Sequence, residues 1–185
     1  GLVVVAPSSP AGVIGLMAAA VRDNNPVIFH EHKALYATKG EVPDGEIIDT
    51  LGTAKILRAG TDCTILALAL MVPRALEAAE ILARDHGINA EVIDVRSLVP
   101  LDTQTILGSV AKTGRLFTVE ENPRLLGWGA EIASIVADEA FWDLNGPIVR
   151  ITTPHIPLPS ADPLEDAVLP NVDRIAETVR RSLGS

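Results

Sequence analysis

Short apolar runs alternate along the chain with stretches whose apolar residues recur every three or four positions. The runs are rich in Val, Ile and Leu and predict strands at 2–6, 27–29, 54–58, 63–70, 90–95, 115–119 and 147–151. Helical spacing follows most of them, with faces marked by Leu16, Leu76, Ile132 and Ile175 and by the segment between Asp102 and Gly114. This alternation predicts a doubly wound sheet with helices on both faces.

Two stretches break the alternation. From about 30 to 52, polar residues together with Gly40, Pro43 and Gly45 interrupt the pattern, which indicates a connection between two domains. A second loop, before the last helix, contains Pro154, Pro157, Pro159 and Pro163. Residues before the connection supply too few elements to close a core. We therefore expect residues after about 54 to form the stable unit and residues 1 to about 40 to be poorly anchored.

Several helix ends are marked by capping residues. Ser9 is a good N-cap, and Pro10 suits the first helical position because its missing N–H costs nothing there. Asp102 is the predicted N-cap of a later helix. Gly87 and Gly114 stand where helices are predicted to end.

Composition and charge narrow the classes of function. Apolar residues make up 48% of the chain but aromatic residues only 3%, so the core is built from aliphatic side chains. A net charge of −9 without a Lys/Arg run argues against nucleic-acid binding. The apolar runs are too short for a membrane span, and no basic segment precedes the first one, as a signal peptide would require.

The sequence supports two further expectations, one about the single cysteine and one about the first residues. Cys63 opens an apolar run, so we interpret it as a small core residue and not as a nucleophile. One cysteine builds neither a disulfide framework nor a multi-cysteine metal site. Gly1 leads directly into a strand, which favours a piece of a longer chain.

Two motifs lie after the strand at 115–119. Gly127-Trp128-Gly129 precedes a helix, but Ile132 stands where a dinucleotide-binding motif has its third small residue, so tight turn geometry is favoured. Glu120 and Glu121 lie at the edge where α/β sheets place their sites. Neighbours on an extended strand point in different directions, which favours a solvated or interface loop over an acid–base pair.

The histidines form no complete site. His30 and His32 flank Glu31, so alternation places both rings on one side as a possible metal pair, but no third ligand is evident. His86 lies at a helix end, and His155 lies in the proline-rich loop. The residues by themselves therefore indicate an α/β domain without a convincing active site.

A resemblance to a known family emerges at Phe29–Tyr36. This segment is similar to the strand and exit loop that end the pyrimidine-binding domain in beta subunits of thiamine-dependent 2-oxo acid dehydrogenases. The family's other motifs follow in order over the whole chain: 2–8, 39–43, 60–70, 90–102, 119–121, 129–132, 150–152 and the prolines up to Pro170. His30 departs from the pattern, because the family has an aromatic or aliphatic residue there.

The resemblance implies a fold and its division. Residues 1–36 would be the tail of a pyrimidine-binding α/β domain, 37–53 a linker, and 54–185 a transketolase C-terminal-like domain. That domain is a three-layer α/β/α fold with a mostly parallel five-stranded sheet, in which one strand is antiparallel. The short strand at 54–58 suits the antiparallel position.

The resemblance also implies an activity for the intact enzyme. Thiamine diphosphate with Mg²⁺ supports decarboxylation of a 2-oxo acid and reductive acylation of a lipoyl group. The family's catalytic Glu and His precede Gly1, and the diphosphate and metal ligands belong to the alpha subunit. This chain would therefore hold no catalytic, cofactor-binding or metal-binding residue and be inactive alone. The segment 153–157 favours a pyruvate or acetoin type over a branched-chain type.

The implied partners are an alpha subunit, a second beta subunit and the peripheral-subunit-binding domain of the lipoyl acyltransferase. Candidate docking residues are Asp143, Asn145 and Ser185, although Asn145 stands where some relatives carry Asp. The acyltransferase domain is typically basic, which suits the acidic chain. The compartment would be the cytoplasm, or the mitochondrial matrix of a eukaryote.

Two alternatives stay open. The chain could be the C-terminal half of another thiamine enzyme, a transketolase or a deoxyxylulose-phosphate synthase, although 39–43 and the proline-rich loop argue against this. It could also be a stand-alone regulatory or binding module of the same fold.

Overall fold

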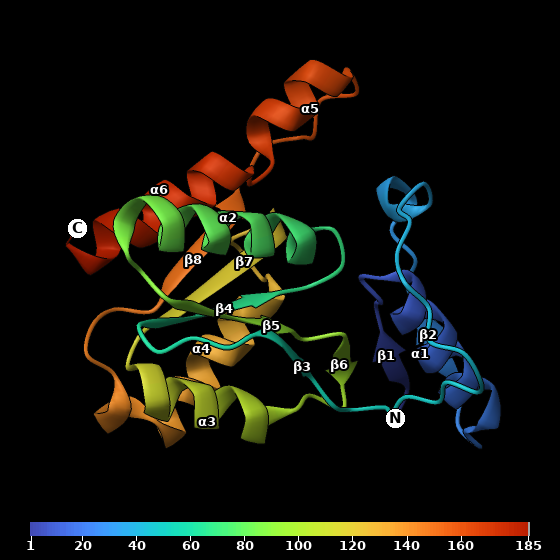
Figure 1. The fold of residues 1–185 in the computed structure, drawn as a ribbon. Coiled ribbons are helices and arrows are strands. Elements are labelled where there is room, and N and C mark those ends of the chain that lie inside the picture. Colours follow the sequence, from blue (N-terminus) through green and yellow to red (C-terminus); the bar gives the residue numbers. More distant parts are fainter. Residues whose placement is uncertain (185) are drawn as a thin grey trace.

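The computed structural model describes residues 1–184 (Figure 1). The strands are β1 Val3–Val5, β2 Val27–Phe29, β3 Lys55–Arg58, β4 Cys63–Ala67, β5 Ala90–Asp94, β6 Ser97–Val99, β7 Leu116–Pro123 and β8 Val149–Thr153. The α-helices are α1 Pro10–Arg22, α2 Met71–His86, α3 Thr103–Thr113, α4 Trp128–Glu139, α5 Asp162–Val168 and α6 Val172–Leu183. Two short 3₁₀ helices are η1 Lys33–Leu35 and η2 Phe141–Asp143.

The main body is a three-layer α/β/α unit. Its five-stranded sheet has the order β3-β5-β4-β7-β8, and the pairs β5-β4, β4-β7 and β7-β8 are parallel. β3 pairs antiparallel with β5, which confirms the odd strand that the sequence predicts. Helices α2 and α6 cover one face and α3 and α4 the other (Figure 1). The expected fold class is confirmed for this main body, whereas the pyrimidine-binding origin of the segment before it stays a prediction.

The central strand β4 shows why these residues form a sheet buried on both faces. All of Cys63–Ala67 is buried. Ile65 faces the core under α2 and α6, whereas Leu66 faces the core under α3 and α4, as the alternation of a strand requires. Burial raises the pKa of the Cys63 thiol to about 12, so the thiolate needed of a nucleophile is strongly disfavoured. The prediction that Cys63 is a core residue is confirmed.

The helix ends follow the capping residues. The Ser9 side chain accepts the amide hydrogen of Gly12 at 3.1 Å, and α1 begins at Pro10. Asp102 caps α3 through Thr105 N at 3.0 Å. Gly87 and Gly114 end α2 and α3 with φ angles of 67° and 68°, in the left-handed region where other residues are strained.

A second, smaller sheet joins the first part of the chain to the main body. Its order is β2-β1-β6, with β1 parallel to β2 and antiparallel to β6. β6 immediately follows β5 through Val95 and Arg96, so one continuous segment contributes to both sheets. The sequence analysis did not foresee β6 or its pairing with β1. The expectation that residues 1 to about 40 are poorly anchored stays a prediction.

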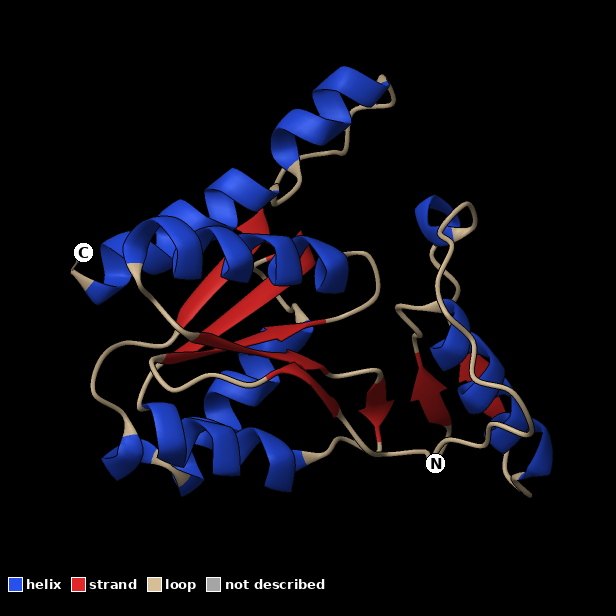
Figure 2. Cartoon of the chain, in the orientation of Figure 1, coloured by secondary structure: helices blue, strands red, loops and turns tan. Residues whose placement is uncertain are grey.

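The proline-rich segment also differs from expectation. It contains the helix α5, which begins at Asp162 and has Pro163 in its first turn, where proline is tolerated. Together with the preceding loop, α5 forms an arm that stands away from α2 and α6 (Figure 2). None of the helices within residues 1–184 combines the length and apolar character needed to cross a membrane.

Candidate functional site

Several polar residues that contact one another lie at the carboxyl ends of the strands of the main sheet. This is the edge where open α/β sheets place their ligands. The backbone is unusual there, because Ala69, Arg96 and Leu126 have φ angles of 48°, 47° and 58°. Non-glycine residues adopt such angles at a cost and cluster at functional sites.

A buried ion pair occupies the end of β7. Arg150 donates from Nε to Oε1 of Glu120 and from Nη2 to Oε2, both at 2.7 Å. The Glu120 carboxylate also accepts from Thr118 Oγ1 at 2.8 Å and from Gly129 N at 3.0 Å. Burial by itself would raise the pKa of Glu120, but these hydrogen bonds outweigh it and hold the pKa below its ordinary value. Glu120 is therefore not the solvated carboxylate that the sequence analysis favoured.

The Gly127-Trp128-Gly129 motif makes room for this ion pair. A Cβ on Gly129 would overlap the Glu120 carboxylate, and a Cβ on Gly127 would overlap the Asn122 amide. Both glycines have an ordinary, negative φ, so they are not required by a left-handed turn. The expectation of tight turn geometry is corrected: the motif lets a buried carboxylate lie against the first turn of α4.

Glu121 points the other way, toward the first part of the chain. His32 Nδ1 accepts the amide hydrogen of Ala34 at 3.2 Å, so Nε2 carries the hydrogen and donates to Glu121 Oε2 at 2.9 Å. His30 is exposed. Within residues 1–184 no three His, Cys, Asp or Glu side chains gather as a metal site would require. His32 therefore joins the two parts of the chain rather than pairing with His30.

A third contact ties the end of β5 to the first part of the chain. Ser8 Oγ donates to Asp94 Oδ2 at 2.5 Å, and the amide of Arg96 donates to Oδ1 at 3.1 Å. Arg96 in turn forms an ion pair with Asp49, and its carbonyl accepts from Ala6 N at 2.8 Å. Burial raises the pKa of Asp94 to about 6, although Ser8 and Arg96 oppose the shift.

A hollow of about 730 Å³ opens beside these contacts, between the first turn of α1 and η1. Its size and mostly apolar walls suit a small ligand or an inserted side chain. Its polar lining residues are Ser8, Ser9, Glu31, His32, Tyr36 and Thr38, and its apolar lining residues are Pro7, Pro10, Val13, Ile14 and Leu35.

The predicted docking residues lie elsewhere, after α4. Asp143 is exposed in η2, and Asn145 is exposed and donates its amide hydrogen to Gly114 O at 2.8 Å. Phe141 and Trp142 form an edge-to-face pair beside them, and the Trp142 side chain is 93% exposed. Sequence reasoning missed this aromatic pair. Ser185 lies outside the described residues.

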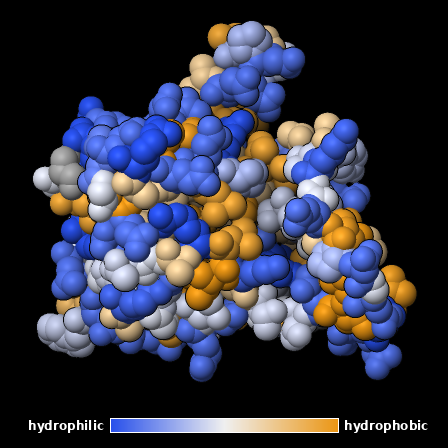
Figure 3. Space-filling model, in the orientation of Figure 1, coloured by the Kyte–Doolittle hydropathy of each residue, from blue (hydrophilic) through white to orange (hydrophobic). Residues whose placement is uncertain are grey.

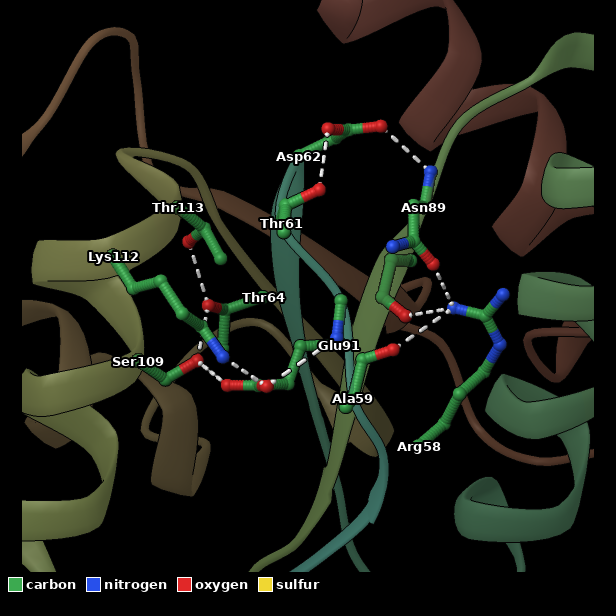
Figure 4. A network of polar contacts seen from close by, with 12 residues as sticks. Arg58, Ala59, Thr61, Asp62, Thr64, Asn89, Glu91, Ser109, Lys112 and Thr113 are labelled. Carbon is green, nitrogen blue, oxygen red and sulfur yellow. Dashed lines mark hydrogen bonds and ion pairs between the residues drawn. The ribbon is translucent and has the colours of Figure 1, made fainter.

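A second polar cluster lies at the opposite end of the sheet, around Glu91 (Figure 4). Glu91 accepts from Ser109 Oγ at 2.6 Å and forms an ion pair with Lys112, while Thr64 contacts Ser109 at 2.6 Å. Gly60 lies so close to the backbone at Ala90 that a Cβ would overlap it. Because these polar groups satisfy one another, the cluster fastens α3 and the β3–β4 turn to the sheet.

Comparison with known proteins identifies the fold. The family described as transketolase, C-terminal domain, matches residues 52–175, more than half of the chain. The chain belongs to this family. The order of the main sheet, with β3 antiparallel at its edge, is thus the order of a transketolase C-terminal domain.

Individual relatives extend the similarity to the segment before residue 52. The beta subunit of acetoin:2,6-dichlorophenolindophenol oxidoreductase from Cupriavidus necator is 45% identical, covering 99% of this chain and 54% of that subunit. The pyruvate dehydrogenase E1 component subunit beta from Leifsonia xyli is 45% identical with the same coverage of 99% and 54%. A structure titled "Split gene transketolase, inactive beta4 tetramer" aligns with a TM-score of 0.79 at 28% identity, covering 99% of this chain and 57% of that one.

These relatives confirm the resemblance to beta subunits of 2-oxo acid dehydrogenases. The chain spans about half the length of the curated relatives it matches. The sequence analysis named Glu120, Glu121 and His32 but missed Ser8, Asp94, Arg96, Asp49 and Arg150. A signal was present for Asp94, since a carboxylate that directly follows Val92 and Ile93 in a buried strand needs a partner.

We expect the buried ion pair of this transketolase C-terminal domain to be essential for its stability. Arg150→Met leaves the Glu120 charge buried without its main partner, which should lower the free energy of unfolding by about 3–5 kcal/mol. The double variant Glu120→Gln/Arg150→Met should recover part of that loss because no charge stays buried. Urea unfolding followed by circular dichroism measures both.

The matched control for this experiment is Arg22→Met. Arg22 pairs with Glu46 at 2.5 Å, but both side chains are exposed. Its loss should cost no more than about 1 kcal/mol. If Arg150→Met costs as little as Arg22→Met, the ion pair does not carry the role assigned to it.

Asp94 should make stability depend on pH. Because its pKa is raised to about 6, the native state binds the proton more tightly than the unfolded chain does. Its contribution to stability is present below about pH 4 and is lost as the pH rises through about 6. The stability of Asp94→Asn relative to the native sequence should therefore increase between pH 4 and 7, by up to about 3 kcal/mol. Asp44→Asn in the exposed linker should show no such trend, and a flat difference for Asp94→Asn would contradict the assignment.

Proposed function

We propose that this chain is the C-terminal half of the beta subunit of a thiamine diphosphate-dependent 2-oxo acid dehydrogenase of the acetoin or pyruvate type. The observation that carries the proposal is 45% identity to such subunits over 99% of the chain, including the segment before residue 52. The geometry supports it, because contacts at Asp94, Arg96 and Glu121 join that segment to the family domain. The chain would serve to hold the two domains of the subunit in a fixed relation.

Whether this chain could hold thiamine diphosphate and its Mg²⁺ depends on which of its side chains lie together. Magnesium on a diphosphate needs a set of oxygen ligands. Residues 1–184 bring together no three carboxylate, imidazole or thiolate groups that would hold the ion, so we assign no step of the reaction to this chain. In the intact enzyme thiamine diphosphate would supply the chemistry of decarboxylation, and this half would contribute to the position of the subunit's domains.

The proposed partners are an alpha subunit, a second beta subunit and the basic binding domain of a lipoyl acyltransferase. Asp143 and Asn145 support the last of these, because they follow the exposed Phe141 and Trp142, which line a hollow of about 540 Å³. Exposed aromatic residues next to acidic ones suit a basic partner that also buries apolar area. The proposed compartment is that of such complexes, the cytoplasm or the mitochondrial matrix.

A chimeric subunit tests the enzymatic proposal. This chain replaces the aligned half of the Cupriavidus necator beta subunit, and the product is co-expressed with that enzyme's alpha subunit. We expect reduction of 2,6-dichlorophenolindophenol with acetoin or pyruvate that depends on thiamine diphosphate and Mg²⁺. The isolated chain should give only the blank rate. An assembled chimera that turns over neither substrate, or that transfers ketol groups between sugars, would reject the assignment.

Binding of the acyltransferase domain is tested by titration at low and high salt. Trp142→Ala should weaken binding by about thirtyfold, the loss expected of an interface hot spot, and Asp143→Asn should reduce the salt dependence. Asp44→Asn, an exposed acidic residue of the linker, is the control. Binding that is insensitive to salt and to Trp142 would move the docking site elsewhere.

A further inference from the structure

Polar and backbone contacts hold the first part of the chain, residues 1–53, against the main body. We call these contacts the junction. Neither hydrophobic cluster of the main body contains a described residue that precedes Ala54, although Val5 of β1 is itself buried. Hydrophobic residues also gather on the surface over α1, but Ile14 and Val21 are exposed there and do not enter the junction (Figure 3). The junction therefore lacks a hydrophobic core shared with the main body.

The backbone part of the junction is short. β1 and β6 have 3 residues each, and their register shifts between Val4 and Val5. Beyond this ladder, Ala6 N donates to Arg96 O at 2.8 Å. A pair of such short strands is marginally stable by itself. The side-chain contacts therefore decide how firmly the two parts stay together.

Asp94 contributes a buried carboxyl group to the junction without a cation bonded to it. Its side chain is enclosed, with the residue only 4% exposed. The carboxyl group contacts Ser8 Oγ at 2.5 Å and accepts the amide hydrogen of Arg96 at 3.1 Å. The guanidinium of Arg96 pairs with Asp49 instead. An ionised carboxylate in this place lacks both water and an opposite charge in contact, whereas a protonated carboxyl fits without that cost.

The charged groups around Asp94 do not offset its burial. Lys55 lies opposite Asp94 in the β3–β5 pair, and the neighbouring strand β4 has no charged residue. Burial raises the pKa of Asp94 to about 6, although the hydrogen bond with Ser8 and the charges of Arg96 and Lys55 oppose the shift. The first part of the chain adds Asp49, a negative charge that pairs with Arg96 and weakens its effect.

The hollow beside α1 gives solvent a route toward Asp94. Ser8 lines this hollow and also contacts the Asp94 carboxyl group. If the start of α1 moves away from β5, Ser8 moves with it, and water from the hollow solvates the carboxylate. An open arrangement of the two parts thus accepts the ionised form at a lower cost than the closed arrangement does.

We propose that Asp94 makes the junction a pH-sensitive switch, in which the protonated carboxyl group holds the start of α1 against β5 and loss of that proton lets the two parts separate. The closed arrangement binds the proton more tightly than the open one. The closed population is therefore largest below about pH 4 and falls as the pH rises through about 6. That the two parts are domains of one subunit rests on the proposed function, whereas the switch itself does not.

The size of the effect follows from the two proton affinities. The ordinary pKa of an aspartate is 3.8, and the closed junction raises it to about 6. Ionisation should therefore change the ratio of closed to open molecules by up to about a hundredfold.

Distances between spin labels measure the opening. Asn24→Cys places one label after α1 and Glu80→Cys places the other on α2, both at exposed positions, while Cys63 stays buried. Double electron–electron resonance is recorded from about pH 4 to about pH 8. We expect one narrow distance distribution at low pH and a second, broader one that grows as the pH rises through about 6.

Two variants of the labelled chain assign the response to Asp94. Asp94→Asn keeps an oxygen for Ser8 but carries no charge, so the narrow distribution should persist at every pH. His32 is a second group of the junction that can gain a proton, and it donates to Glu121. His32→Gln keeps a donor for Glu121 but does not titrate, so the response to pH should remain.

A second pair of labels controls for unfolding. Glu80→Cys with Gln104→Cys places both labels on the main body, on α2 and α3, at exposed positions. Their distance should stay constant over the same pH range.

Four results would overturn the proposal. They are a native chain whose distances do not change with pH, an Asp94→Asn variant that opens as the native chain does, a His32→Gln variant that no longer responds, and a control pair that changes together with the first pair. Because turnover is not measured, such a result leaves the enzymatic assignment standing. An inactive chimera would reject the proposed function and leave the switch standing.

Discussion

The arrangement of the carboxyl edge depends on the buried pair of Glu120 and Arg150. A carboxylate without solvent is tolerated only if donors surround it, and this one receives two bonds from Arg150 and others from Thr118, Asn122 and Gly129. These donors come from β8, from β7 itself and from the first turn of α4. The pair therefore positions β8 beside β7, the first turn of α4 and the loop between them. The glycines on either side of Trp128 follow from this constraint, because larger residues would occupy the space of the carboxylate.

The contacts that join the first part of the chain to the main body also include a buried carboxylate, that of Asp94, but it has fewer hydrogen-bond donors than Glu120. Asp94 is as enclosed as Glu120 but receives only the hydroxyl of Ser8 and one amide, with no direct partner of opposite charge. Its pKa is therefore raised, whereas that of Glu120 is lowered. A junction fixed by such polar contacts is geometrically specific yet weakly stabilising. That suits the proposed role of these contacts, which is to hold two domains of the subunit in one orientation.

The features that could be predicted from the sequence are those that depend on the local pattern of residues. The strand at 54–58, the caps at Ser9 and Asp102 and the glycine helix ends are confirmed because each is determined within a few residues. The divergent directions of Glu120 and Glu121 also followed from alternation. Alternation could not predict their partners, since Arg150 lies 30 residues from Glu120 and His32 lies 89 residues from Glu121 in the chain. β6 was missed because three residues after a turn carry no periodicity, and α5 because Pro163 and the prolines before the helix resemble a loop.

The three residues with strained backbone, Ala69, Arg96 and Leu126, differ in the contacts that surround them. Arg96 adopts φ 47°, and its contacts with Asp49 and Ala6 offset the backbone strain. Ala69 adopts φ 48° where α2 begins, and its carbonyl accepts the amide hydrogen of Val72. At Leu126 the loop is equally well held, but the leucine side chain itself is exposed to solvent. Selection for folding alone would favour glycine at this position.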